Sequence, residues 1–323
     1  MVTSHEWTFV SAFIDLDSYQ KGNTNSRSAK DYLDSAISTL SLPVPLCIFL
    51  SESVYDIVLK KTENRTYPTS IIPINFEALR TFSFYERICK NRSSDKYKNF
   101  YTNNRNTPAY FILTASKFEF LKMAVEKNQF NSSMFAWIDF HYGHCDKSFS
   151  LESMHNQVKD IVSYPLSYWP KNRYNLGLIS WVPTSNFLDK SLYDRPDGIR
   201  TGFAGGFNCG PASTINKIAD ALFKELQETV SQGMGHAEEQ LYYYLYRKNP
   251  EWFDIFPCDY YSIIFNVLYP TRDINCTINF LLPKLVDDKQ FNVAKTCIAK
   301  LIMSHTKGLI ELPQTFFNKY FLF

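Results

Sequence analysis

Short apolar runs alternate along this chain with longer segments of helical periodicity, and this alternation is the strongest constraint on its fold. The first run, TFVSAFID at 8–15, is rich in β-forming residues and predicts a buried strand. Residues 28–40 have the spacing of an amphipathic helix, and VPLCIFL at 44–50 predicts a second buried strand. Strands that alternate with helices favour a mainly parallel sheet covered on both faces. The sequence therefore predicts an α/β fold that opens with a β-α-β unit.

The alternation continues through the rest of the chain. Further strands are expected at 69–74, 133–140 and 174–181. Helices are expected at 107–128, 213–231, 236–248, 275–286 and 291–303. No linker, low-complexity tract or internal repeat divides the chain. We therefore predict one main domain over residues 1–265 and a helical C-terminal extension, residues 266–323, that packs on it.

Charge and composition exclude several classes of function. Lys and Arg number 34 against 32 Asp and Glu, so the positive excess needed along a polynucleotide is missing. No apolar run approaches the roughly 18 residues that span a bilayer, and the start MVTSHEWTFV has no signal-peptide pattern. The seven cysteines show no C-x-x-C spacing. We expect a cytoplasmic protein, lumenal only if a leader is missing, that binds no nucleic acid.

The sharpest candidate for chemistry is Asp139, which ends the apolar run SMFAWIDF. An unpaired carboxylate inside a sheet has a large desolvation cost, so Asp139 is expected at the carboxyl edge, where such sheets bind ligands. His141 would lie on the same side of an extended chain and, with Asp139, offer one oxygen and one imidazole ligand to Mn²⁺. The alternative is that Asp139 caps the following turn and His141 is a solvated loop residue.

A second candidate is the Gly-rich segment GFAGGFNCG at 202–210. Its glycines, Gly205 and Gly206 among them, permit positive φ or a close approach to a ligand, and Phe203 and Phe207 would offer ring faces to a sugar. The segment matches neither G-x-G-x-x-G nor the P-loop. The alternative is a turn around a β-bulge.

The third candidate is GHAEEQ at 235–240, at the start of an expected helix. Glu238 or Glu239 there would be stabilised by the helix N-terminus and could act as a base toward an acceptor hydroxyl. His236 would be a further metal ligand. The alternative is that both carboxylates only complement the helix dipole.

Four cations in and near the expected helix at 107–128 are candidate contacts for a diphosphate, because positive groups are needed opposite a departing phosphate. They are Arg87, Arg105, Lys117 and Lys122. The alternative for each is an ordinary surface charge. The chain contains no G-x-S-x-G and no H-E-x-x-H motif, which argues against the familiar hydrolase classes.

Five segments, in this order, resemble the HtrL/YibB-like family, which is grouped with glycosyltransferases of the GT-A type. They are TFVSAFID, KFEFLKMAV, MFAWIDF, AGGFNCG and EEQLYYYLYRKNPEWFDIFPCDY, and they cover roughly the first 265 residues. The resemblance implies a GT-A-like, Rossmann-related fold with a nucleotide-sugar-binding catalytic domain. The sequence departs from the family at His141, where a small residue is expected, and this leaves the second metal ligand open.

The resemblance also implies roles for individual residues. Asp139 would bind the metal, and Glu239 or Glu238 would face the acceptor hydroxyl as the catalytic carboxylate. The residues expected around the donor are Phe13, Asp15, Arg87, Arg105, Lys117, Gly205, Gly206 and Gln240.

The function expected from these residues is metal-dependent transfer of a sugar from a nucleoside-diphosphate sugar to a hydroxyl of a glycan or other acceptor. A UDP-sugar is the first candidate for the donor. Mn²⁺ or Mg²⁺ would neutralise the departing diphosphate. Two alternatives stay open. One is a nucleotide-sugar hydrolase, which would release free sugar, and the other is an inactive glycan-binding or scaffold protein with the same fold.

Overall fold

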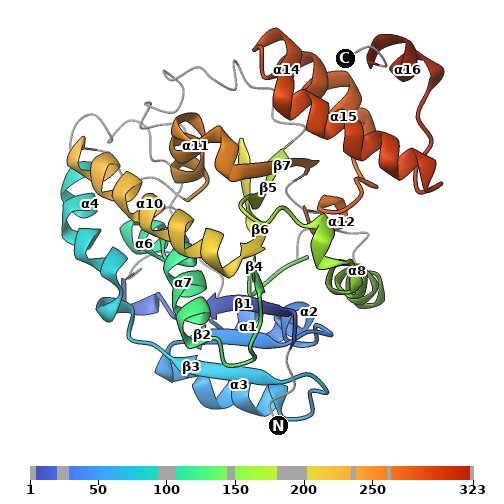
Figure 1. Ribbon diagram of the computed structural model, residues 1–323. Helices are drawn as coiled ribbons and strands as arrows, with labels where there is room; N and C mark the ends of the chain where they lie inside the picture. The colour runs from blue at the N-terminus through green and yellow to red at the C-terminus, as the bar shows by residue number, and fades with distance from the viewer. Residues whose placement is uncertain are drawn as a thin grey trace.

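The computed structural model describes residues 5–19, 29–93, 107–143, 150–179, 202–233, 238–259 and 263–320. A mixed sheet of seven strands, ordered β3-β2-β1-β4-β6-β5-β7, runs through the molecule (Figure 1). The strands are β1 (Trp7–Phe13), β2 (Leu46–Leu50), β3 (Thr69–Pro73), β4 (Met134–Ile138), β5 (Tyr174–Ile179), β6 (Phe203–Pro211) and β7 (Phe253–Cys258). Only β6 runs antiparallel to its neighbours in this sheet, so the expected mainly parallel α/β sheet is confirmed.

Each central strand sends its side chains alternately into two separate hydrophobic cores. In β1, Val10 belongs to one core and Phe9 to the other, and in β4 Trp137 and Ile138 are divided in the same way. A strand that is buried on both faces has no solvent-exposed face for polar side chains. These strands are therefore nearly continuous apolar runs.

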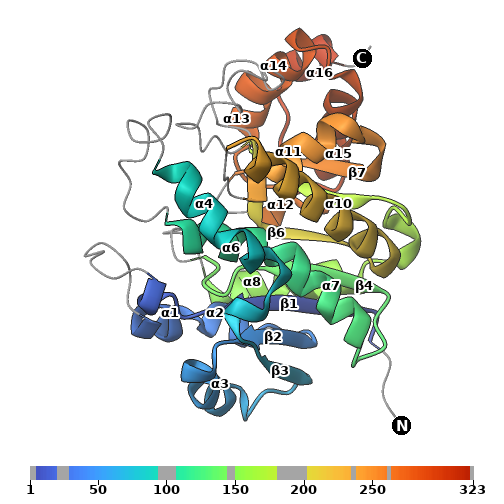
Figure 2. The ribbon, with the colours of Figure 1, turned by 90° about the vertical axis from the view of Figure 1, so that its left-hand side faces the viewer.

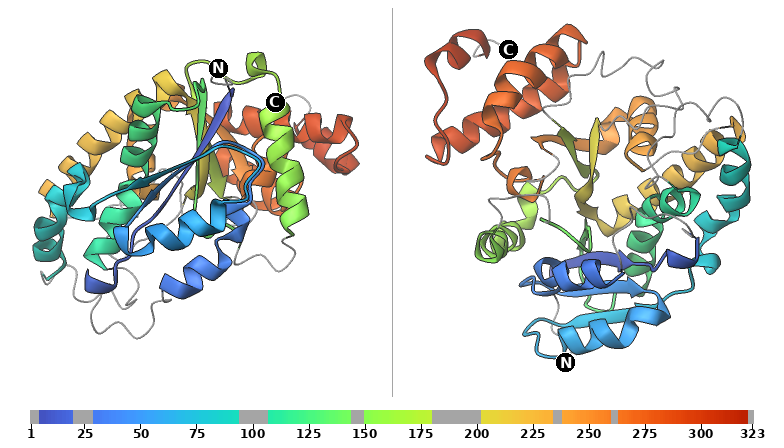
Figure 3. Two further views of the ribbon diagram at one scale, coloured as in Figure 1. Left: turned by 90° about the horizontal axis from the view of Figure 1, so that it is seen from below. Right: turned by 180° about the vertical axis from the view of Figure 1, so that it is seen from behind.

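Helices cover both faces of the sheet (Figure 3). Those against the first core, which face the viewer in Figure 2, are α4 (Tyr85–Arg92), α6 (Pro108–Ala115), α7 (Lys117–Lys127), α10 (Ala212–Ser231) and α11 (Glu238–Lys248). Those against the second core are α1 (Ala29–Ser35), α2 (Ile37–Leu40), α3 (Tyr55–Thr62), α8 (Leu151–Ser163) and α12 (Ile263–Asn266).

The C-terminal part is helical, as expected, and lies beyond the β7 end of the sheet (Figure 1). It contains α13 (Ile274–Cys276), a π-helical turn (Thr277–Leu281), α14 (Leu282–Asp287), α15 (Phe291–Thr306) and α16 (Gln314–Tyr320). Lys300 of α15 donates a hydrogen bond to the carbonyl of Val267 (3.1 Å) and lies 3.7 Å from the carboxylate of Asp254 in β7. The division at residue 265 stays a prediction.

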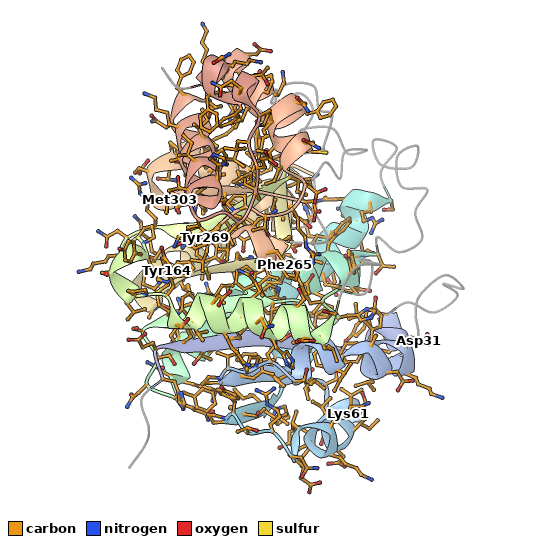
Figure 4. All side chains as sticks on the ribbon, turned by 90° about the vertical axis from the view of Figure 1, so that its right-hand side faces the viewer. Asp31, Lys61, Tyr164, Phe265, Tyr269 and Met303 are labelled. Atoms are coloured by element: carbon orange, nitrogen blue, oxygen red, sulfur yellow. The ribbon has the colours of Figure 1, made fainter. Side chains whose placement is uncertain are left out.

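Tyrosines also join α8 to the segment that leads into the C-terminal helices. The hydroxyl of Tyr269 donates to that of Tyr164, and their rings meet edge to face with centroids 5.7 Å apart (Figure 4). None of the described helices is long and apolar enough to cross a membrane.

Two predicted helices are interrupted in the structure. The helix expected at 107–128 is divided at Ser116 into α6 and α7, and it ends where Asn128 takes a left-handed conformation. The helix expected at 28–40 is divided at Ala36. Asn128 is one of the few residue types that close a helix in this conformation at low cost.

The Gly-rich segment forms strand β6 and not a turn. The positive-φ glycines in the described residues are Gly143, Gly233 and Gly308, so none of the glycines of this segment uses that freedom. The expectation that Phe203 and Phe207 offer rings to a sugar is wrong, because both side chains are fully buried in the two cores. The expected irregularity does occur, as a register shift of β5 against β6 between Leu176 and Leu178.

The burial of Phe207 leads to a test of the fold. Its ring lies 5.8 Å from that of Phe9, between centroids, in the second core. Replacement of Phe207 by Ala is expected to lower the free energy of unfolding by about 3–5 kcal/mol, because a cavity remains. Urea denaturation measures this loss. Phe280→Ala is the matched control, because Phe280 is 64% exposed and its loss should change stability by less than about 0.5 kcal/mol. Equal effects of the two substitutions would contradict the described core.

Candidate functional site

Asp139 follows directly after β4 at the carboxyl edge of the sheet, as the sequence predicts. Its backbone is held from three sides. The N–H of Asp139 donates to the carbonyl of Gly206 (3.0 Å), and the Thr39 hydroxyl donates to the carbonyl of Asp139 (2.9 Å). The Ser11 hydroxyl donates to the preceding carbonyl of Ile138 (2.8 Å). These bonds fix the point at which the chain leaves the sheet.

The side chain of Asp139 is held through one of its two oxygens. Oδ1 lies 2.9 Å from Nζ of Lys117 and accepts a hydrogen bond from the indole N–H of Trp137 (2.8 Å). The side chain is 37% exposed, and no contact of the described residues uses Oδ2. One oxygen therefore orients the carboxylate while the other is open to a ligand.

Lys117, the first residue of α7, connects three segments of the chain. Its ammonium lies 2.5 Å from Oε1 of Glu238 and donates a hydrogen bond to the carbonyl of Gly205 (3.1 Å), in addition to its contact with Asp139. Burial lowers the pKa of Lys117, but the negative charges of Asp139, Glu238 and Glu239 outweigh burial and raise this pKa well above its usual value. Lys117 is therefore a permanent positive charge at this edge.

Glu238 and Glu239 begin α11 on the far side of Lys117. Glu238 is 1% exposed, and within the described residues neither of its oxygens has a hydrogen bond, so its ion pair with Lys117 is its main support. Glu239 is 8% exposed. Burial first, and then the charge of Glu238, raises the pKa of Glu239 to about 8, although Lys117 lowers it. At neutral pH Glu239 therefore carries a proton. We call Lys117, Asp139, Glu238 and Glu239 the Lys117 cluster.

Gly205 and Gly206 allow this cluster to lie against the start of β6. A Cβ at Gly205 would collide with the carboxylate of Glu238 and lie 3.2 Å from Oε1 of Glu239. A Cβ at Gly206 would lie 3.5 Å from Oδ2 of Asp139. Gly205 is therefore needed for the close approach of the Glu238 carboxylate and not for an unusual φ, whereas the distance at Gly206 is an ordinary van der Waals contact.

The structure separates His141 from the extended geometry expected for Asp-x-His. Strand β4 ends at Ile138, and a turn with Gly143 at φ +83° follows Asp139, so Asp139 and His141 do not share a strand. The His141 ring packs edge to face on Tyr32, with centroids 5.2 Å apart. The third predicted ligand, His236, lies outside the described residues. Within the described part of the chain, no group of three or more His, Cys, Asp or Glu could hold a metal ion.

The remaining predicted donor contacts lie in different surroundings. Phe13 is buried and stacks on Phe140, with ring centroids 5.2 Å apart. Asp15 is half-buried and stabilises the turn in which it lies. Its backbone N–H donates to the Ser51 hydroxyl (2.8 Å), and its carboxylate accepts a hydrogen bond from the N–H of Asp17 (3.0 Å).

Of the predicted cations, only Lys117 is shown at the site. Arg87 is exposed on α4, and Lys122 pairs with Asp220 of α10 (2.6 Å). Arg105 lies outside the described residues. Gln240 is 1% exposed in the first turn of α11, next to the two glutamates.

Sequence reasoning missed Trp137, although a signal for it exists. Trp137 stands two residues before Asp139, and residues two apart in a strand point to the same face. Its indole N–H orients the carboxylate, and its ring lies 5.7 Å from the Lys117 ammonium. Tyr110, which is half-buried, was also missed. Burial and the charges of Glu238 and Glu239 raise its pKa, so its hydroxyl is neutral beside the cluster.

The strand order and the one antiparallel strand of the described sheet define an α/β protein of the GT-A-like, Rossmann-related class. Residues 5–268 match the family model described as "Bacterial protein of unknown function (HtrL_YibB)", and the chain belongs to this family. This is the family that its motifs resemble, and the function of the family is unknown.

Curated proteins and solved structures give two further comparisons. No curated protein matches it. Among solved structures it is similar to the crystal structure of mouse xyloside xylosyltransferase 1 in its apo form, with 10% sequence identity, coverage of 79% of this chain and 85% of that chain, and a TM-score of 0.39.

The raised pKa of Glu239 predicts how stability depends on pH. The pKa is about 8 in the folded state against an ordinary 4.5, so the stability from the bound proton is complete below pH 4.5 and is lost as pH rises through 8. Glu239→Gln stays neutral at every pH. The variant should therefore gain stability relative to the wild type between pH 5 and pH 9, as measured by urea denaturation.

The control is Glu126→Gln, which changes an exposed glutamate of α7 and should show no such gain. A stability difference between Glu239→Gln and the wild type that is the same at both pH values would contradict the protonated state of Glu239.

Proposed function

We propose that the protein is a glycosyltransferase that transfers a sugar from a nucleoside-diphosphate sugar to a hydroxyl of a glycan or other acceptor. A UDP-sugar is the first candidate for the donor. The observation that carries this proposal is the Lys117 cluster at the carboxyl edge of a GT-A-like sheet. Ligands of such sheets bind at that edge. The cluster combines a half-exposed carboxylate, a permanent cation and a carboxyl that is protonated at neutral pH, and these are groups that donor binding and proton transfer require.

The donor side of the proposal rests on Asp139. Its free Oδ2 and 37% exposed side chain suit a hard divalent cation, which prefers carboxylate oxygens and completes its shell with phosphates and water. Asp139 would hold Mn²⁺ or Mg²⁺, with His141 and His236 as the further candidate ligands. Such an ion, when bound, would neutralise charge on the departing diphosphate.

Within the chain itself, Lys117 and Trp137 hold Asp139 in one orientation through Oδ1. An aligned carboxylate does not have to be ordered when the donor binds, and this lowers the entropic cost of binding. We propose that Lys117 acts mainly through this alignment, because its ammonium is already engaged by two carboxylates and a carbonyl.

The acceptor side of the proposal rests on Glu239. In the transfer step the acceptor oxygen forms a bond to the anomeric carbon, the bond from that carbon to the diphosphate breaks, and the acceptor proton must go to a base. Glu239, once ionised, would take this proton, while Glu238 is held by Lys117 and is nearly inaccessible. In a retaining mechanism the same carboxyls would position the acceptor.

Donor binding is the first test. Calorimetry with a panel of nucleoside-diphosphate sugars in Mn²⁺ should show binding of one donor, and EDTA should abolish it. Asp139→Asn keeps the shape of the side chain and removes its charge, so the affinity should fall at least about tenfold. The matched control is Asp220→Asn, because Asp220 is 52% exposed and pairs with Lys122 away from the cluster.

Three results would contradict this proposal: no donor bound, binding indifferent to EDTA, or equal binding by the Asp139 and Asp220 variants. Product analysis separates the alternatives. Transfer gives a glycosylated acceptor, whereas a hydrolase gives free sugar without any acceptor.

The pKa of Glu239 predicts a pH profile for the reaction. Because the proton is bound up to about pH 8, a base at this position becomes active only as pH rises, so kcat/KM should increase about tenfold per pH unit below 8 and level off above it. Glu239→Gln should lower the rate by roughly 10²–10⁴ and remove this rise. Glu126→Gln should retain both rate and profile. A Glu239→Gln enzyme with the wild-type profile would exclude Glu239 as the base.

A further inference from the structure

A cavity of about 650 Å³ lies at the other end of the sheet from the Lys117 cluster. Strands β5 and β7 begin beside it, and a 3₁₀ turn (Pro250–Trp252) and the start of α15 form two of its walls. Strands of this length span about 17–20 Å, so the cavity is distant from the carboxyl edge. Figure 1 shows β7 between α11 and α15, the two helices that supply residues to the cavity. It is therefore separate from the proposed donor site.

The floor of the cavity is apolar and its rim is cationic. Tyr246, Phe253 and Ile255 form the floor, and each is about 4% exposed. The charged residues of the rim are the cations Arg173, Lys289 and Lys295 and the anion Glu251. None of the three cations has an ion pair or hydrogen bond from its side chain in the described part of the chain. The rim therefore has an excess of positive charge above an apolar floor, which suits a ligand that has a negative group and an uncharged ring.

Lys289 occupies a backbone position at which glycine is the usual residue. It follows α14 with φ +59°, its N–H donates to the carbonyl of Val286 (3.0 Å), and the N–H of Gln290 donates to that of Leu285 (2.7 Å). This pair of bonds is the Schellman motif, whose left-handed residue is most often Gly. A lysine here is conformationally less favourable than glycine, and its side chain is placed at the rim of the cavity.

The start of α15 adds further polar groups to the same wall. Asn292 and Thr296 line the cavity beside Lys295, on a helix of 16 residues whose N-terminal end carries a partial positive charge. The cations of the rim and the side-chain amide of Asn292 therefore offer donors to one negative group and to neighbouring hydroxyls, while the Thr296 hydroxyl donates to the carbonyl of Asn292 (3.1 Å) and offers an acceptor.

We propose that this cavity binds an acidic sugar, with its carboxylate or phosphate at Arg173, Lys289 and Lys295 and its ring over the apolar floor. The anionic part of this assignment stands on the cavity alone. The sugar part rests on the proposed function, because a glycosyltransferase has glycans as acceptors and products. The site would hold a charged residue of such a glycan at a distance from the reacting hydroxyl.

Calorimetry on the full chain tests this proposal with four probes: glucuronic acid, glucose 6-phosphate, neutral glucose and inorganic phosphate. We expect one or both acidic sugars to bind at least about tenfold more tightly than glucose and than inorganic phosphate. The first two probes show whether the site prefers a carboxylate or a phosphate. The double variant Lys289→Gln with Lys295→Gln should lose at least about tenfold in affinity.

The matched control is Lys60→Gln with Lys224→Gln, which removes two exposed charges elsewhere and should leave acidic-sugar binding unchanged. Lys289→Gly separates a ligand-binding role from a structural one. It restores the usual residue of the motif, so the melting temperature should rise while acidic-sugar binding weakens.

The proposal is overturned if no acidic sugar binds, if inorganic phosphate or glucose binds as well as the acidic sugars, or if the double variant binds like its control. Nucleotide-sugar binding by the double variant should equal that of the wild type. Failure of the wild type to bind any nucleotide sugar would contradict the proposed function. The measured binding of acidic sugars at this cavity would still test the anionic part of the present proposal.

Discussion

The ammonium of Lys117 holds together three parts of the chain that meet only because of the fold. It contacts Asp139 after β4, Glu238 at the start of α11, and the carbonyl of Gly205 in β6. A buried carboxylate without a counter-charge is strongly destabilising, so the positions of β4, β6 and α11 at this edge depend on one cation. Burial first, and then the charge of Glu238, raises the pKa of Glu239, and the single positive charge of Lys117 lowers this pKa without cancelling the increase.

The antiparallel strand β6 is what brings the carboxylates to the backbone. It begins at the carboxyl edge, where the parallel strands end, so Gly205 and Gly206 extend past the last residue of β4. A side chain at Gly205 would occupy the space of the Glu238 carboxylate. Gly205 therefore serves an internal contact, and the carboxylates at this edge come from Asp139 and from the first turn of α11.

The parts of the fold that the sequence predicted are those with a local signal. The runs that form β1, β2 and β4 are apolar on both faces, and such runs have few alternatives. Strand β7 was missed because Asp254 and Pro257 break its pattern. Proline is tolerated there because β7 lies at the edge of the sheet and, among the described strands, pairs with β5 alone. The position of Asp139 followed from its strand. Its pairing with Lys117, and the contact of Lys117 with Glu238, join distant parts of the chain and leave no periodic signal.

The composition of the Lys117 cluster bears on whether the fold is catalytic or only a scaffold. Ion pairs in a protein interior are often replaced by apolar residues of similar volume with no loss of stability, so a scaffold does not need them. Here Glu238 is buried with its ion pair to Lys117 but with no hydrogen bond in the described residues, and burial raises the pKa of Glu239 to about 8. A buried carboxyl with a raised pKa beside a carboxylate that keeps one oxygen open suits the proton transfer of the proposed reaction. Such a cluster is therefore expected of the proposed transferase, whereas an inactive scaffold would not need it.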